Sequence, residues 1–271
     1  MMKTVAIPNE IVCDGTAAEV EFAAKRLREL SAKQHLVLDG ALQINPATSI
    51  KDFINRTFQL EDYRIYYGAT DVENLGRFAC EYLGGGDFDS TYFDDGEHTL
   101  SIAPNGAFTE YGYVYKCSDN APEVYDGTNL DEFRDEDFSV ILRIAAPNGT
   151  ESVSLRLPDL SVEYGMPDEV AIAQDALGVA DIAECRLVDV RCVLPSVGNL
   201  ADEYDGRLAE LIQDANRFGT LLWRGNSSFL ARVDAIMELM DYGTLAEALR
   251  TAEYVGQVDL RQQSEPSMEM M

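Results

Sequence analysis

Apolar residues in the first third of the chain recur three and four positions apart, which is the spacing of one face of an α-helix. The clearest example is 16–30, where a capping-box signature precedes the apolar series. The same spacing predicts helices at 49–54 and 70–82, and a run of three glycines at 84–86 is a typical stop signal. We therefore predict a helical unit over residues 1–83.

The pattern changes after the glycines to short alternating stretches separated by turn residues. Strands are predicted at 98–103 and at 111–116, because apolar or aromatic residues alternate with small or polar ones there. The alternating aromatics of the second stretch are Tyr111, Tyr113 and Tyr115. Acidic residues are frequent throughout, so residues 84–138 are predicted to form an acidic, β-rich module.

The next segment combines a hairpin, a helix and a strand. Two β-type runs within 139–157 flank Pro-Asn-Gly, whose Asn and Gly tolerate the positive φ of a tight turn. A helical pattern follows at 166–177 and a strand pattern at 183–194. Residues 139–197 are therefore predicted to form an α/β module with a β-hairpin.

Helical spacing returns in the last quarter, which predicts a second helical unit over residues 198–260 and a disordered tail over 261–271. The segments 49–54 and 244–249 occupy similar places in the two helical units. Duplication of the unit is one interpretation, and chance recurrence of capped amphipathic helices is the other. The predicted fold class is α+β, an elongated chain of small helical units and small β-rich or α/β modules.

Composition restricts the partners. The 271 residues include 48 acids and 21 bases, which gives a formal net charge of −27. A nucleic-acid-binding protein needs a basic surface, and an anionic membrane repels an acidic chain, so we expect neither direct nucleic-acid nor membrane binding. The five cysteines are scattered without a C-x-x-C motif, which is typical of a reducing compartment and predicts a cytoplasmic protein. Its expected partners are basic surfaces or cations.

The negative charge is distributed unevenly. Residues 84–138 hold 14 acids and 2 bases, and residues 158–206 hold 11 acids and 2 bases. Within a short helix predicted around 131–137, two pairs of acids lie four positions apart, and each pair costs roughly 0.2–0.5 kcal/mol. A solvated face kept for solubility is one explanation, but the clustering favours a surface selected for its electric field.

Residues for catalysis or metal binding are scarce. The only histidines are His35, expected to be a partly exposed filler on a helix, and His98, expected at a strand edge. The acidic run 84–98 fails as an EF-hand, because Tyr92 takes the place of the glycine and His98 the place of the final glutamate. We predict no catalytic residue, cofactor or metal site, and a carboxylate-dependent hydrolase is the least favoured alternative.

Several segments resemble, in the same order, motifs of the ArdA-type antirestriction proteins of mobile genetic elements. They are A-E-V-E-F-A-A-K-R-L-R-E-L-S (18–31), S-I-K-D-F-I-N-R-T-F-Q-L-E-D-Y (49–63), D-V-E-N-L-G-R-F (71–78) and G-A-F-T-E-Y-G-Y-V-Y (106–115). A second group resembles the N-terminal α/β module of that family: S-L-R-L-P (154–158), M-P-D-E-V-A-I-A-Q-D-A-L-G-V (166–179) and R-L-V-D-V-R-C (186–192). The order of modules here departs from the family, in which the α/β module comes first.

The resemblance implies a DNA mimic rather than an enzyme. Such proteins are elongated, acidic and often dimeric, and they occupy the DNA-binding groove of type I restriction-modification enzymes. The alternative is an acidic interaction module that binds another basic or DNA-binding protein, such as a CRISPR nuclease or a repressor. The acids expected to replace phosphates form a main acidic patch of Asp87, Asp89, Asp94, Asp95, Asp126, Asp131, Glu132, Asp135, Glu136 and Asp137. A second acidic patch comprises Asp159, Glu163, Asp168, Glu169, Asp175, Asp181 and Glu184.

Overall fold

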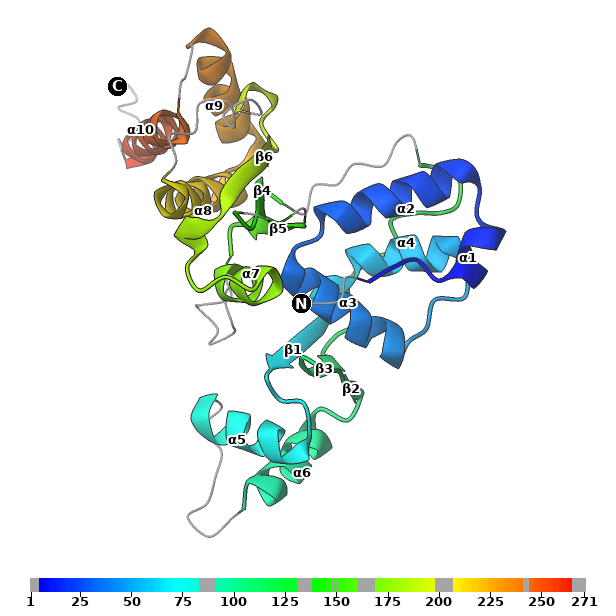
Figure 1. The fold of residues 1–271 in the computed structure, drawn as a ribbon. Helices are drawn as coiled ribbons and strands as arrows, with labels where there is room; N and C mark the ends of the chain where they lie inside the picture. Colours follow the sequence, from blue (N-terminus) through cyan, green and yellow to red (C-terminus); the bar gives the residue numbers. More distant parts are fainter. Residues whose placement is uncertain are drawn as a thin grey trace, which may run out of the picture. The chain divides into compact units, whose positions relative to one another are not determined.

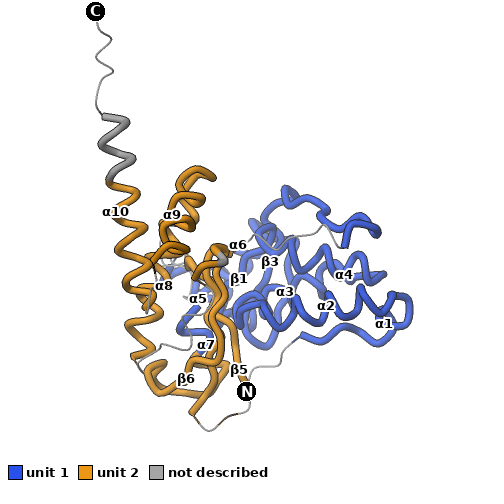
Figure 2. The backbone as a smooth tube through the Cα atoms, turned by 90° about the horizontal axis from the view of Figure 1, so that it is seen from above, with its two compact units in different colours: residues 1–134, 160–173 blue, residues 135–159, 174–271 orange. Residues whose placement is uncertain are grey.

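The computed structural model describes residues 5–82, 91–130, 138–147, 149, 151–159, 169–197, 207–240 and 244–264. Helices and two three-stranded antiparallel sheets make up this part of the chain (Figure 1). The predicted α+β class is therefore confirmed. The chain divides into two compact units, residues 1–134 with 160–173 (unit 1) and residues 135–159 with 174–271 (unit 2; Figure 2).

Unit 1 begins with four helices and continues with a small sheet and a helical hairpin. Its elements are α1 (Asn9–Asp14), α2 (Ala17–Glu29), α3 (Ala32–Ile44), α4 (Ile50–Phe58), the 3-10 turn η1 (Leu60–Asp62), β1 (Tyr63–Tyr67), α5 (Val72–Tyr82), α6 (Tyr92–Ile102), β2 (Gly106–Phe108) and β3 (Gly112–Lys116). The hydroxyls of Thr16, Ser31 and Ser49 accept N–H groups at the starts of α2, α3 and α4. These caps satisfy backbone donors that a helix start otherwise leaves unpaired, so local chemistry sets where each helix begins.

The sheet of unit 1 joins segments that the sequence assigns to different modules. Its order is β1-β3-β2, and β1 pairs antiparallel with β3 from Tyr63 opposite Lys116 to Tyr67 opposite Gly112. The prediction that 1–83 is wholly helical is thus wrong at β1, and residue 83 does not separate two folding units. Helix α3 packs on this sheet at Gly40, where any side chain would overlap that of Val114.

His35 lies on α3 and is only 8% exposed, so it is more buried than predicted. Its ring is hydrogen-bonded to the backbone of Leu27, and burial is the main reason that its pKa falls from 6.5 to about 4. At neutral pH the buried imidazole is therefore uncharged.

Helix α6 replaces the predicted strand at 98–103, and the predicted strand at 111–116 is confirmed as β3. The helix begins with a capping box in which Thr91 and Asp94 each bond the other's backbone N–H. His98 consequently lies exposed on a helix rather than at a strand edge.

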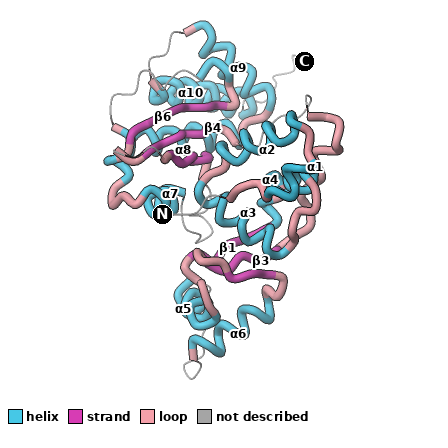
Figure 3. Tube along the Cα trace, turned by 45° about the vertical axis from the view of Figure 1, so that its right-hand side comes forward, coloured by secondary structure: helices cyan, strands magenta, loops and turns pink. Residues whose placement is uncertain are grey.

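Helices α5 and α6 lie side by side as an antiparallel hairpin (Figures 1 and 3). A Cβ atom on Gly76 would overlap the carbonyl oxygen of Tyr92, and one on Gly96 would overlap that of Val72. Gly76 lies opposite Tyr92, and Val72, earlier in α5, lies opposite Gly96, later in α6. The two helices therefore run antiparallel. The two glycines therefore allow the helix backbones to touch, and they fix how the hairpin presents its side chains.

Unit 2 contains the second sheet and three long helices. Its elements are β4 (Val140–Ala145), β5 (Ser152–Leu157), η3 (Ile182–Glu184), β6 (Arg186–Cys192), η4 (Pro195–Val197), α8 (Leu208–Arg224), α9 (Ser227–Leu239) and α10 (Leu245–Ser264), and α7 (Glu169–Leu177) crosses the division between the units. The sheet order is β5-β4-β6, with antiparallel pairing throughout. The predicted hairpin, the strand and the last helices are confirmed. Helix α10 reaches Ser264, so it extends into the predicted tail, whose remainder lies outside the described residues.

Helix α8 packs on the sheet of unit 2, which places the predicted α/β module and the second helical unit in one compact body. Leu142 of β4 and Phe218 of α8 are both fully buried. Helix α10 packs in turn on α8, where Arg217 and Glu253 form an ion pair with an N–O distance of 2.6 Å. The module boundary predicted near residue 197 is thus not a boundary between compact units.

Candidate partner-binding surface

The loop that follows β3, residues 117–130, carries three exposed carboxylates. We call it the acidic loop. The side chains of Asp119 and Glu123 are 85% and 61% exposed, and Asp126 is also exposed. The loop contains no helix or strand, and side chains of other elements hold its backbone in place.

Asp62 holds the first half of the acidic loop. Its Oδ1 accepts the N–H of Asn120 at 2.9 Å and that of Ala121 at 3.2 Å, and it also accepts the hydroxyl of Ser118. Burial of Asp62 favours the neutral acid, but these hydrogen bonds outweigh it and lower the pKa. The buried carboxylate thus remains ionised and accepts hydrogen bonds from the backbone of the loop, as a capping side chain does at the start of a helix.

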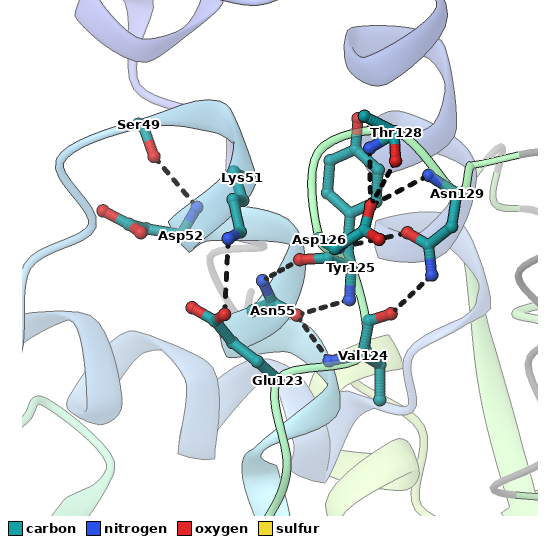
Figure 4. A network of polar contacts seen from close by, with 10 residues as sticks. All are labelled: Ser49, Lys51, Asp52, Asn55, Glu123, Val124, Tyr125, Asp126, Thr128 and Asn129. Atoms are coloured by element: carbon teal, nitrogen blue, oxygen red, sulfur yellow. Dashed lines mark hydrogen bonds and ion pairs between the residues drawn. The ribbon is translucent and has the colours of Figure 1, made fainter.

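Asn55 holds the second half of the acidic loop (Figure 4). This side chain of α4 is 3% exposed, and its Oδ1 accepts the N–H groups of Val124 and Tyr125, both at 2.9 Å. Its Nδ2 donates to the carbonyl oxygen of Tyr125 at 2.8 Å. One amide therefore satisfies three backbone groups of the loop, which would be costly to bury unpaired.

Tyr125 anchors the same half of the loop in the protein interior. It is 3% exposed, and its hydroxyl donates to Oε1 of Glu19 on α2 at 2.9 Å. Desolvation, followed by this hydrogen bond, raises the pKa of Tyr125 to about 12. The ring is therefore neutral at physiological pH and fixes the loop to α2 as well as to α4.

Asp126 organises the turn at the end of the loop (Figure 4). Its Oδ1 accepts the N–H of Thr128 at 2.7 Å and that of Asn129 at 3.1 Å, and the hydroxyl of Thr128 also donates to it. Chiefly through the Thr128 N–H, these bonds lower the pKa of Asp126, so its charge persists below neutral pH. The acid is thus both fixed in position and fully ionised.

Two lysines approach the loop. Lys51 of α4 lies 3.3 Å from a carboxylate oxygen of Glu123, and Lys116 pairs with Asp119. Exposed ion pairs of this kind contribute little free energy, and a lysine side chain can rotate away. The pairs therefore reduce the local negative charge without closing the carboxylates to a partner.

Two arginines of unit 1, Arg26 and Arg56, contact groups of the fold rather than the acidic loop. Arg26 is 2% exposed, lies 4.0 Å from the ring centroid of Phe58 and donates to the carbonyl oxygen of Thr57 at 3.1 Å. Arg56 donates to the hydroxyl of Tyr63 at 2.8 Å. These two guanidinium groups therefore contribute to the packing and hydrogen bonding of unit 1.

Three members of the predicted main acidic patch are described, and they lie on two separate elements. Asp94 and Asp95 belong to α6, whereas Asp126 belongs to the acidic loop. Asp94 is exposed, and its bonds to the hydroxyl and N–H of Thr91 lower its pKa. Asp95 is half-buried and accepts a hydrogen bond from the thiol of Cys80 at 3.1 Å. The members outside the described residues are Asp87, Asp89, Asp131, Glu132, Asp135, Glu136 and Asp137.

The described members of the predicted second acidic patch divide between the protein interior and the surface. Glu169 is 6% exposed in unit 1, and its Oε1 accepts the hydroxyl of Ser31 at 2.8 Å, so its predicted role as a surface acid is wrong. Asp175, Asp181 and Glu184 are exposed and belong to unit 2. The remaining members are Asp159, which is half-buried in unit 2, and Glu163 and Asp168, which lie outside the described residues.

The residues that organise the acidic loop were missed by the sequence reasoning. Asn55 follows Phe53 and Ile54 on the apolar side of its helix, and Asp62 precedes a strand of aromatic residues. A polar residue at a position that periodicity assigns to the core is the signal that could have identified Asn55.

Within the described ranges, no group of His, Cys, Asp and Glu side chains is arranged to hold a metal ion. Likewise, none of the described helices is long and apolar enough to cross a membrane. Comparison with protein-family models, with curated proteins and with solved structures finds no match to this chain.

Proposed function

We propose that this protein is an acidic DNA mimic that inhibits type I restriction-modification enzymes by occupying their DNA-binding groove. The observation that carries the proposal is the acidic loop, in which Asp119, Glu123 and Asp126 project from a backbone held by buried Asn55 and Asp62. The carboxylates act as substitutes for phosphates and perform no chemistry.

The fixed backbone matters because a partner does not have to order it. Ordering a mobile loop on binding costs free energy, and a preformed loop avoids that cost. An enzyme that grips a duplex lines its groove with Lys and Arg, because the duplex presents one negative charge per ~1.7 Å of axis. Ionised carboxylates at fixed positions on a chain of net charge −27 offer such a groove an alternative ligand.

The enzyme class comes from the resemblance of segments 18–31, 49–63, 71–78 and 106–115 to ArdA-type proteins. In this structure those segments contribute α2, α4, η1, β1, α5, β2 and β3. Of these elements, α2, α4 and η1 hold the acidic loop through Glu19, Asn55 and Asp62, and these contacts support the proposal.

An electrophoretic competition assay tests the proposal. A type I methyltransferase bound to a labelled duplex is titrated with the full chain, which should displace the DNA at low salt and less effectively as salt rises. Neutralising the loop (Asp119→Asn, Glu123→Gln and Asp126→Asn together) should weaken competition by about tenfold, because each exposed ion pair contributes only a small free energy.

A matched control removes the same number of exposed acids from unit 2 (Glu151→Gln, Asp189→Asn and Glu238→Gln), and it should compete more strongly than the loop variant. Lys51→Gln removes the positive charge beside Glu123 and should improve competition, which loss of folding cannot mimic. Failure of the wild-type chain to displace DNA at low salt rejects the mimic. Binding to the methyltransferase without displacement indicates the acidic interaction module instead.

A further inference from the structure

We propose that the α5–α6 hairpin is a second contact surface, one that binds arginine side chains of a basic partner between exposed aromatic rings and carboxylates. The inference deepens the proposed function and rests on it, because it names the side-chain chemistry that this part of unit 1 recognises on a DNA-binding protein.

Among the described residues of the hairpin, three large aromatic side chains are exposed. Tyr82 is 62% exposed, Tyr92 47% and Phe93 52%. Tyr82 ends α5, and the other two residues begin α6. Since the helices are antiparallel, these three residues lie at the same end of the hairpin. Single exposed apolar residues are ordinary on protein surfaces, but three rings at one end of a small hairpin require a reason.

The hairpin presents these rings rigidly. Gly76 and Gly96 bring the two helix backbones into direct contact, which leaves little freedom for one helix to slide along the other. Phe78 stacks on Tyr66 with a centroid distance of 4.9 Å, and its other neighbour is Tyr82, also at 4.9 Å. The exposed end of the aromatic series is therefore continuous with the buried cluster over the sheet.

Exposed acidic residues lie close to the rings along the two helices and favour a positively charged partner. Glu81 adjoins Tyr82 in sequence, and Asp94 and Glu97 follow Phe93 along α6; all three acids are exposed. An apolar partner would bury these carboxylates without compensation, which is costly. A partner that carries positive charge beside apolar surface satisfies both requirements, so charge complementarity selects a basic segment.

The rings then favour arginine over lysine. A guanidinium group is planar, weakly hydrated and able to stack on an aromatic face while it donates two parallel hydrogen bonds to a carboxylate. An ammonium group is strongly hydrated and acts as a point charge. The hairpin already contains one such contact, because the guanidinium carbon of Arg77 lies 5.6 Å from the ring centroid of Tyr92.

Two synthetic peptides of equal charge, nona-arginine and nona-lysine, test the inference. Their affinities for the full chain are measured by fluorescence anisotropy at one ionic strength, and the wild type should bind nona-arginine at least about fivefold more tightly. The double variant Tyr92→Leu with Phe93→Leu removes the rings but keeps every charge and the helix-forming tendency. It should lose most of the preference by weakening nona-arginine binding alone.

Tyr254→Leu is the matched control, because it removes an exposed ring from α10 in unit 2 and should leave the preference unchanged. Equal loss of both peptides in the double variant, or no loss of nona-arginine binding, overturns the inference. The outcome is independent of the restriction enzyme: a chain that prefers arginine but never displaces DNA contradicts the proposed function and supports this surface.

Discussion

Lowering the pH from 7 to 5 should reduce the stability of unit 1, because folding keeps the buried imidazole of His35 from taking up a proton. His35→Gln should remove most of this loss of stability. The folded chain holds the pKa of this imidazole at about 4 and the ordinary value is 6.5. Between these two values the unfolded chain takes up a proton that the folded chain refuses. The stability contribution is therefore complete above pH 6.5 and is lost as the pH falls toward 4.

The size of the effect follows from the difference between the two pKa values. One pKa unit corresponds to about 1.4 kcal/mol, so the full difference is worth about 3 kcal/mol, of which about 2 kcal/mol is lost between pH 7 and pH 5. Most carboxylates remain ionised in this interval, which separates the histidine from the acids that titrate at lower pH. His35 is 8% exposed, so solvent screening reduces the effect only slightly.

Urea unfolding at pH 7, 6 and 5 measures the effect. Far-UV circular dichroism reports both units, whereas fluorescence of Trp223, the single tryptophan, reports unit 2 and serves as an internal control. His98→Gln changes the exposed histidine of α6 and should keep the wild-type pH dependence. Equal stability of wild-type unit 1 at pH 7 and pH 5, or a loss of the dependence in His98→Gln, would refute the reasoning.

Three further changes test other parts of the structure. Asn55→Ala removes the hydrogen-bond partner of three backbone groups of the acidic loop. The urea midpoint of unit 1 should therefore fall by the equivalent of about 3 kcal/mol, and DNA displacement should weaken. Gly76→Ala should cost about 3 kcal/mol by forcing α5 away from α6, whereas Gly68→Ala, whose φ is +83° and whose Cβ meets open space, should cost about 1 kcal/mol; thermal unfolding compares them. Reversing four acids within 131–137 should lower inhibition of a type I restriction enzyme, and unchanged inhibition by a folded variant rejects those residues as part of the contact.

Local chemistry made most helix starts and the second sheet predictable. The hydroxyl caps of Thr16 and Ser49 follow directly from the residue pattern, as does the hairpin within 139–157. Helix α6 was missed because its two aromatic residues and its glycine are typical of strands and turns. Its capping box and the close contact of Gly96 with α5 outweigh that composition. The contact with α5 is a tertiary interaction, so a prediction from local residue patterns does not include it.

The sequence predicts which residues of the candidate surface are acidic, but it does not predict which of those acids are exposed. Asp126 is exposed, as expected of a surface acid, but Glu169 has the same charge and is buried against Ser31. Burial depends on long-range packing, and Ser31 lies far from Glu169 along the chain. The same holds for Asn55 and Asp62, whose roles depend on a loop that begins more than fifty residues later.

The net negative charge makes stability and binding respond in opposite directions to added salt. In unit 2, Arg156 is 6% exposed and lies 5.2 Å from the ring centroid of Phe138, with Arg191 at 5.1 Å from the same ring, so these two bases contribute to packing. A chain of net charge −27 repels itself, and added salt screens that repulsion. Salt should therefore raise the unfolding midpoint while it weakens attachment to a basic groove. An acidic surface kept only for solubility would show the first response without the second, which makes the pair of measurements more informative than either alone.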